Sequence, residues 1–177
     1  VEEVLFAGEA HLIRGDSDRP NIHYNVIRSY AKTRDAFKLS LLKEKPLLIF
    51  CGTRSRSESM ARELAVYYGY DKVRFYHAGL EKAEKTAVEK WFYDKKDAIL
   101  CCTCAYGMGV DKQDIRTVIH LEPPSSAEAY LQESGRAARD GGIGNAYLLW
   151  SSADEKRFSK ANAASRERAI FNFATAS

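Results

Sequence analysis

Two arginines three residues apart lie in a glycine-containing segment whose residue types suit the binding of a phosphate. The segment spans residues 132–141, and its arginines are Arg136 and Arg139. A guanidinium group is planar and permanently charged, so it can donate paired hydrogen bonds to phosphate oxygens. In phosphoryl transfer a positioned arginine can accelerate the reaction by about 10³- to 10⁵-fold. The alternative interpretation is a basic loop whose arginines pair with Glu133 and Asp140.

The sequence lacks the glycine-rich loop that holds a nucleoside triphosphate in many hydrolases. That loop has the pattern Gly-x-x-x-x-Gly-Lys-Ser/Thr, and none of the 11 glycines of this chain is followed by lysine. The chain therefore has arginines that could contact phosphates and no loop to cradle them. We expect it not to hydrolyse a nucleoside triphosphate on its own.

Two further segments with phosphate-binding character follow predicted strands. Thr53 and Arg54 stand where a strand gives way to a helix, and a helix N-terminus with hydroxyl and guanidinium groups suits a phosphate. An N-cap with solvated arginines explains the same residues equally well. His77 ends the next predicted strand and could contact a phosphate or a carboxylate, but a lone histidine is more often structural.

A fourth candidate is the polar loop over residues 103–112. Gly107 and Gly109 let the backbone turn sharply and present N–H groups to an anion. The position of the loop directly after an apolar strand strengthens this interpretation. The alternative is a simple turn in which Asp111 caps whatever follows.

These segments lie between predicted strands and helices. The sequence alternates short apolar runs with amphipathic helical stretches. We expect strands at 22–27, 47–51, 73–77, 98–103, 117–121 and 146–150, and helices at 33–44, 57–68, 80–96, 127–134 and 153–177. The inward side chains of the first three helices should be Phe37, Leu41, Leu42, Met60, Leu64, Tyr67, Val88, Trp91 and Phe92. This alternation predicts an α/β fold with three layers and a mostly parallel sheet.

Composition sets broad limits on partners and location. With 27 basic and 24 acidic residues the net charge is +3, which permits a nucleic-acid partner without requiring one. No run of 18 apolar residues occurs, so we expect no membrane span. The chain begins with Val1 rather than methionine, and we expect it to be a piece of a longer polypeptide.

The four cysteines include a Cys-x-x-Cys pair, Cys101 and Cys104, which could suggest zinc. Cys101 and Cys102 fall in a predicted strand, whose alternation would send them to opposite faces. No second cysteine or histidine pair stands at ligand spacing. We therefore expect no zinc or other metal site, and unbridged cysteines that suit a reducing, intracellular compartment.

Several of these segments occur together, and in order they resemble the second RecA-like motor lobe of superfamily-two helicases, specifically the RecQ DNA helicases. The similarity runs from about Asp18 to Phe158. It is carried by Asp18–Ile22, Leu48–Arg54, Tyr76–Leu80, Ala105–Lys112 and Gln132–Gly141. DEAD-box RNA helicases have His-Arg where this chain has Gln132-Glu133, which favours the RecQ group.

The resemblance implies an α/β RecA-like fold, a three-layer αβα sandwich with a mostly parallel central sheet. It also implies a division of the chain. Residues 18–152 would form the second helicase lobe, 1–17 would lead in from the preceding lobe, and 153–177 would be a truncated helical tail.

It further implies roles at an ATP cleft between two lobes. Arg139 would be the arginine finger, with Arg136 beside it on the phosphates, and Gln132 would couple the nucleotide state to lobe closure. Gly109 and Asp111 would line the cleft. ATP with Mg²⁺ would be held mainly by the first lobe of the same parent chain.

The same resemblance places other residues along DNA. Those expected on single-strand phosphates are Thr53, Arg54, His77, Gly79 and Thr103. The parent would be an ATP-dependent 3′-to-5′ helicase of single-stranded and duplex DNA, active in repair and recombination. It would be cytoplasmic in a bacterium and nuclear in a eukaryote. The alternatives are the equivalent lobe of an RNA helicase and a catalytically idle nucleic-acid-binding adaptor.

The chain departs from the family at three places. Ala138 replaces a usual glycine and should stiffen the arginine segment, Asp111 replaces a common asparagine, and Gly52-Thr53 replaces Asn-Ser.

Overall fold

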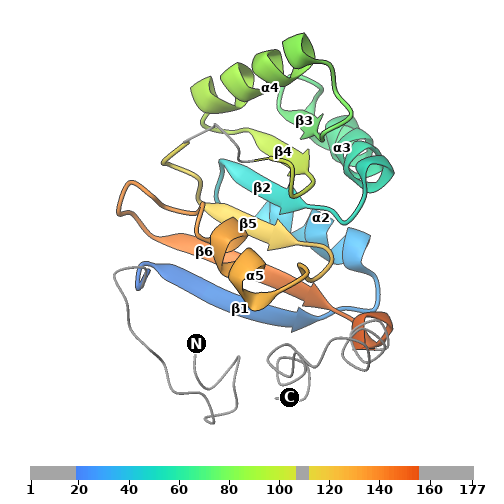
Figure 1. The fold of residues 1–177 in the computed structure, drawn as a ribbon, viewed down its shortest axis with the longest axis vertical. Coiled ribbons are helices and arrows are strands. Elements are labelled where there is room, and N and C mark those ends of the chain that lie inside the picture. Colours follow the sequence, from blue (N-terminus) through green and yellow to red (C-terminus); the bar gives the residue numbers. More distant parts are fainter. Residues whose placement is uncertain (1–18, 107–111, 156–177) are drawn as a thin grey trace.

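The computed structural model describes residues 19–106 and 112–155, which form one six-stranded sheet with helices on both faces (Figure 1). The strands are β1 Ile22–Arg28, β2 Leu47–Phe50, β3 Val73–Tyr76, β4 Ile99–Cys102, β5 Thr117–His120 and β6 Gly144–Trp150. Their order across the sheet is β1-β6-β5-β2-β4-β3, and every pairing between these strands is parallel. The predicted α/β sandwich is confirmed, with a sheet that is wholly parallel rather than mostly so.

In the described part of the chain, four helices connect the strands and cover the sheet. They are α2 Lys32–Leu42, α3 Arg54–Tyr68, α4 Lys82–Asp94 and α5 Ala127–Ser134. Side chains of α2 and α3 pack on one face of the sheet, and those of α4 and α5 pack on the other. In Figure 1, α2 accordingly lies behind the sheet and α5 in front of it.

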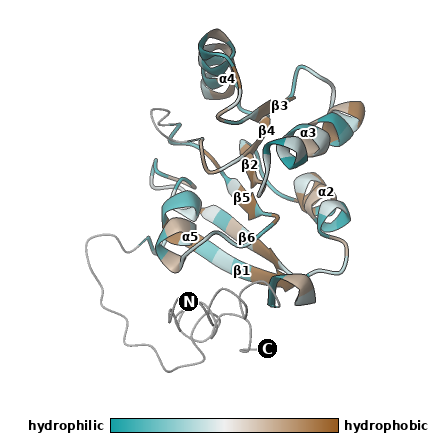
Figure 2. Ribbon diagram, turned by 45° about the vertical axis from the view of Figure 1, so that its right-hand side comes forward, coloured by the Kyte–Doolittle hydropathy of each residue, from teal (hydrophilic) through white to brown (hydrophobic). Residues whose placement is uncertain are grey.

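The central strands are apolar because both of their faces are covered. All four residues of β2, β4 and β5 are buried, although Thr117 and His120 of β5 are polar, and Figure 2 shows hydrophobic colour along β2 and β4. Cys101 packs on the side of α3 and Cys102 on the side of α4, as strand alternation predicts. Burial raises the pKa of both thiols, so they are inert core residues.

Local signals set the helix ends that matter for the site. The Thr53 hydroxyl accepts a hydrogen bond from Arg56 N at 3.1 Å and begins α3. Gly69 ends α3 with φ of +97°, a conformation that a residue with a Cβ adopts only with strain. Ser126 caps α5 in the same way as Thr53 caps α3, through Ala129 N at 3.1 Å.

Three side chains expected inside are exposed instead. Leu41, Leu42 and Tyr67 expose 43%, 78% and 63% of their surface. The buried stripe of α2 is Ala36, Leu39 and Ser40, so the two leucines at its C-terminal end turn away from the sheet. Tyr67 lies off the stripe of α3 and packs edge-on against Phe37 at 5.4 Å.

Some of the remaining predictions can be compared with the structure, and others concern residues that it does not describe. Trp91 is only half-buried, while Met60, Leu64, Val88 and Phe92 are buried as predicted. Residues 1–17 and most of the predicted tail, 156–177, lie outside the described residues. Among the helices in the described ranges, none combines the length and apolar character that a membrane crossing needs.

Candidate functional site

The arginine loop, residues 135–142, joins α5 to β6 and presents its two arginines differently. Arg139 is exposed, but only 9% of the Arg136 surface is accessible. The backbone between them is inaccessible, because Ala137 and Ala138 are fully buried. Of the two candidate arginines only Arg139 is therefore exposed, and its Nε donates a hydrogen bond to Gly135 O at 3.4 Å. Arg136 is held against the core, with its guanidinium carbon 5.9 Å from the centre of the Tyr106 ring.

The Arg136 side chain is buried without a carboxylate partner among the described residues. Its Nε is buried and makes no hydrogen bond there. Burial, followed by the nearby charge of Arg139, lowers the pKa of Arg136 below its usual value, although a guanidinium stays charged. A buried cation with no carboxylate in direct contact is costly, and an anion that reached it would offset part of that cost.

The two acidic neighbours of the arginines bind other residues. Glu133 Oε2 lies 2.9 Å from His120 Nε2, and Asp140 forms a two-armed ion pair with Arg116. The Arg116 pair lowers the pKa of Asp140 to about 2. Neither carboxylate forms an ion pair with Arg136, although the charge of Glu133 still acts to raise the pKa of Arg136.

Tyr106 brings the loop after β4 next to the arginine loop. It is buried against Tyr76 at 5.3 Å and Phe92 at 6.0 Å between ring centres, and the Arg136 guanidinium lies over its ring. The candidates Gly109 and Asp111, with Gly107, follow Tyr106 within residues 107–111 and lie outside the described residues. Their placement in an ATP cleft stays a prediction.

Gln132 is exposed on the last turn of α5, one turn before Arg136. The next residue, Glu133, ties α5 to β5 through His120, whose ring is fully buried and stacks on Phe50 at 5.0 Å. Burial lowers the pKa of His120, and the hydrogen bond to Glu133 opposes that shift. Sequence reasoning gave His120 no role, because its partner lies 13 residues away on another element.

A second group of candidates gathers where β2, β4 and β3 end. A Cβ placed on Gly79 would lie 3.0 Å from Arg54 Nη1 and 3.2 Å from His77 Nδ1, so these three residues meet. Thr103 N donates to Tyr76 O at 3.1 Å, which holds the start of the loop after β4 beside this group. Thr53 and Arg54 are exposed at the adjoining N-terminus of α3.

His77 contacts residues of both α3 and β3 within this second group. Its Nε2 lies 3.0 Å from Glu58 Oε1 on α3, and its ring stacks on Phe75 at 5.5 Å. Only 5% of the residue is accessible, and its Nδ1 has no hydrogen-bond partner among the described residues. Glu58 was not a candidate from the sequence, since its link to His77 depends on how α3 packs against β3.

The Thr53 hydroxyl already accepts a hydrogen bond as the N-cap of α3, so the structural alternative for this residue holds in part. A hydroxyl that caps a helix can still donate its proton to a phosphate. Glu122, after β5, accepts a hydrogen bond from Gly52 N at 2.9 Å and places one negative charge beside this group.

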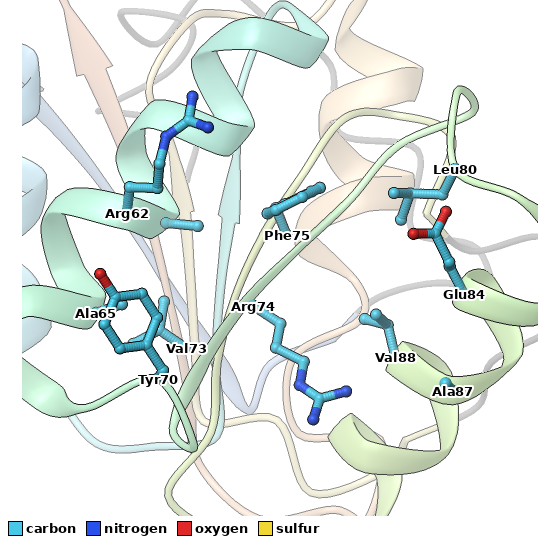
Figure 3. Close-up of a pocket in the computed structure, with 11 residues that line it drawn as sticks. Arg62, Ala65, Tyr70, Val73, Arg74, Phe75, Leu80, Glu84, Ala87 and Val88 are labelled. Carbon is cyan, nitrogen blue, oxygen red and sulfur yellow. The ribbon is translucent and has the colours of Figure 1, made fainter.

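An apolar groove of about 390 Å³ lies elsewhere, between α3 and α4 over β3, a strand at one end of the sheet (Figure 3). Arg74 and Phe75 form its floor, with Arg62 and Ala65 on one side and Val88 on the other. None of the candidate residues named above lines it.

Metal ligands are likewise not assembled in the described ranges, where no group of three or more His, Cys, Asp or Glu side chains could hold an ion.

Comparisons with known proteins bear on the family of the chain. The family described as the helicase conserved C-terminal domain matches residues 31–141. The chain is 36% identical over 140 residues to a probable ATP-dependent DNA helicase RecS of Bacillus subtilis, covering 77% of this chain and 28% of that protein. It is 35% identical over 145 residues to ATP-dependent DNA helicase RecQ of Pasteurella multocida, covering 81% and 23%.

The fold is similar to that of solved helicase domains. Domain 2 of the DEAD-box helicase Mss116p, bound to an RNA duplex, aligns with a TM-score of 0.66 at 22% identity, over 83% of this chain and 61% of that one. At that identity the likeness shows the fold alone. The chain spans about a quarter of the length of the two curated relatives.

Proposed function

Because the chain belongs to the helicase conserved C-terminal domain family, with RecQ-type DNA helicases among its relatives, we propose that it is the second motor lobe of a RecQ-like ATP-dependent 3′-to-5′ DNA helicase. The lobe supplies arginines to ATP bound by the first lobe of its parent and grips single-strand phosphates. The observation that carries this proposal is Arg136, a buried cation whose neighbouring carboxylates are bound to other residues.

The arginine loop would act on the triphosphate when the two lobes close. Arg139, exposed at the surface, reaches across the junction, while Arg136 receives a phosphate oxygen on its buried side. Arginines that contact the transferred phosphoryl group stabilise charge that develops only in the transition state. Mg²⁺ would add charge neutralisation from the first lobe, and we assign none of its ligands to this chain.

The second group would hold the nucleic acid by its backbone. Arg54 offers a guanidinium at the start of α3, where the helix dipole also favours an anion. Gly79 leaves room beside Arg54 and His77, since a side chain there would crowd both. Contacts of this kind read the sugar–phosphate chain rather than base sequence. We place the parent in a reducing compartment, consistent with four free cysteines.

The direct test is Arg139→Ala in the intact helicase. We expect the ATPase kcat to fall by about 10³-fold or more, because the lost interaction acts in the transition state. The KM for ATP should change little. Arg28→Ala, at the exposed end of β1, is the matched control and should leave kcat unchanged. Normal ATPase activity in the Arg139 variant would refute the assignment.

A further inference from the structure

The loop that carries both candidate arginines is held by residues just ahead of β1, and we propose that Arg19 and Asn21 are positioning residues for Arg136 and Arg139. The inference rests on the proposed function, in which these arginines contact the triphosphate. Nothing in the sequence pattern indicated it, since Arg19 and Asn21 lie more than 110 residues from the loop.

Arg19 binds the backbone on both sides of Arg136. Its guanidinium donates hydrogen bonds to Gly135 O at 3.2 Å, Ala137 O at 3.0 Å and Ala138 O at 2.8 Å. Hydrogen bonds from a charged donor are about twice as strong as neutral ones. The planar fork therefore fixes three peptide groups at once, which a lysine could not do with the same geometry.

Asn21 continues the same contact toward β6. Its Nδ2 donates to Ala138 O at 3.0 Å and to Gly142 O at 2.7 Å. Its backbone O accepts a hydrogen bond from Gly144 N at 2.9 Å, where β6 begins. Arg19 Nε also reaches Asn21 Oδ1 at 3.4 Å, so the two side chains form one unit.

These contacts converge on the strained residue of the loop. Ala138 has φ of +48°, a left-handed conformation that disfavours a Cβ, and it stands directly before Arg139. Its N donates to Ile115 O at 2.7 Å, and its O accepts from Arg19, Asn21 and Gly141. Strain of this kind persists only where the surroundings enforce it. Without Arg19 or Asn21 the peptide can rotate, and the direction of Arg139 changes with it.

Two variants remove the contacts with little change in size. Arg19→Lys keeps the positive charge and loses the fork. Asn21→Asp keeps the shape and replaces the donor with an acceptor that repels two carbonyls. Arg28→Lys, at the other end of β1, is the matched control, because Arg28 is exposed there.

The first readout is amide hydrogen exchange in the 177-residue chain, which does not depend on ATP. We expect exchange of residues 135–142 to accelerate by about tenfold or more in both test variants, with the amides of β2 and β4 unchanged. Unchanged exchange in the loop overturns the inference. If one of the two variants fails to fold, amide exchange in the other variant decides whether the inference holds.

The second readout is the ATPase of the intact helicase. A misdirected arginine should lower kcat by between about tenfold and a hundredfold with little change in KM for ATP. If Arg19 and Asn21 only stabilised the fold, their substitution would leave kcat unchanged after correction for the folded fraction. If Arg139→Ala abolishes turnover while Arg19→Lys and Asn21→Asp do not, the positioning role is wrong. If Arg139→Ala itself has no effect, the proposed function fails, and hydrogen exchange alone decides whether the loop is held.

Discussion

Arg136 places a positive charge where the described residues offer an aromatic face rather than a carboxylate. An arginine near a tyrosine ring gains about 0.5 to 2 kcal/mol, which is less than the cost of burying an unpaired ion. The contacts that the described residues make with Arg136 therefore explain its burial poorly as a device for stability. The burial is well explained if an anion completes the site in the working helicase.

A separate prediction concerns Arg54, which belongs to the second group of candidates, those proposed to hold nucleic acid. Arg54→Ala should weaken binding of single-stranded DNA to a similar extent for every sequence, because a phosphate contact carries no base information. The slope of log affinity against log salt should become shallower by about 0.7, the value for one contact on a single strand. Fluorescence anisotropy over a salt series measures both quantities.

Lys90→Ala, on the exposed side of α4, is the control for that experiment. It should leave the affinity and the salt slope unchanged. An Arg54 variant with unaltered affinity would remove this residue from the DNA contact.

His120 makes the fold sensitive to pH. Burial holds its folded-state pKa below the ordinary 6.5, despite the opposing hydrogen bond to Glu133. His120 is therefore protonated near pH 6.5 in the unfolded chain, but only at a lower pH in the folded chain. The stability that comes from keeping His120 neutral and buried is fully present above pH 6.5. It is lost as the pH falls toward the folded-state pKa.

Urea unfolding between pH 5 and 7 tests this sign. His120→Gln should show a shallower loss of stability over that range than the wild type, while His23→Gln, at an exposed position, should not. Equal slopes in the wild type and the His120 variant would contradict the assignment.

Most helices and strands could be predicted from the sequence, because apolar runs and capping residues act locally. The N-cap role of Ser126 and the end of α3 at Gly69 follow from such signals. The outward turn of Leu42 could not be predicted, since periodicity defines a stripe and not the point where the sheet beneath it ends.

The candidate site was less accessible to prediction. Thr53, His77 and Thr103 each come shortly after a strand of one parallel sheet, so strand alternation alone accounts for their lying at the same edge. The burial of Arg136 depends on Tyr106, and the support of His77 depends on Glu58. Both are tertiary contacts between distant elements, for which the local pattern has no signal.

The tight packing of Gly144, at the start of β6, against the arginine loop can be tested by substitution. A Cβ on Gly144 would lie 2.9 Å from the Ala137 Cβ and 3.0 Å from the Ala138 Cβ, closer than side chains normally approach. Gly144→Ala should therefore push the arginine loop away from β6 and destabilise the fold by about 1 to 3 kcal/mol. Chemical denaturation measures the change.

The matched substitution is Gly141→Ala, where a Cβ would meet nothing within 4 Å. Its cost should come from the backbone alone, because Gly141 has φ of +82°. If Gly144→Ala leaves stability unchanged, the tight packing between the loop and β6 is wrong.

The molecule taken as a whole should bind DNA weakly and turn over no ATP by itself. It has no glycine-rich loop followed by lysine, and phosphate contacts from one lobe should give an affinity that falls steeply with salt. Binding that did not respond to salt would count against the phosphate contacts proposed for this lobe.

The choice between DNA and RNA also belongs to the whole helicase. We expect the intact parent to prefer single-stranded DNA over RNA of the same sequence. A clear preference for RNA would point instead to a reader of the 2′-hydroxyl and to the RNA-remodelling alternative. Binding of either strand without any ATPase, in a parent whose first lobe is intact, would indicate the idle adaptor.

The position of β1 at one end of the sheet has a consequence for how the chain is made. Its neighbour is β6, and residues 22–28 pair with residues 144–150. During synthesis β1 therefore emerges from the ribosome long before the strand it will join, and contacts between such distant residues form slowly. β1 therefore cannot gain its partner strand until β6 has been synthesised, so this end of the sheet cannot form earlier than that.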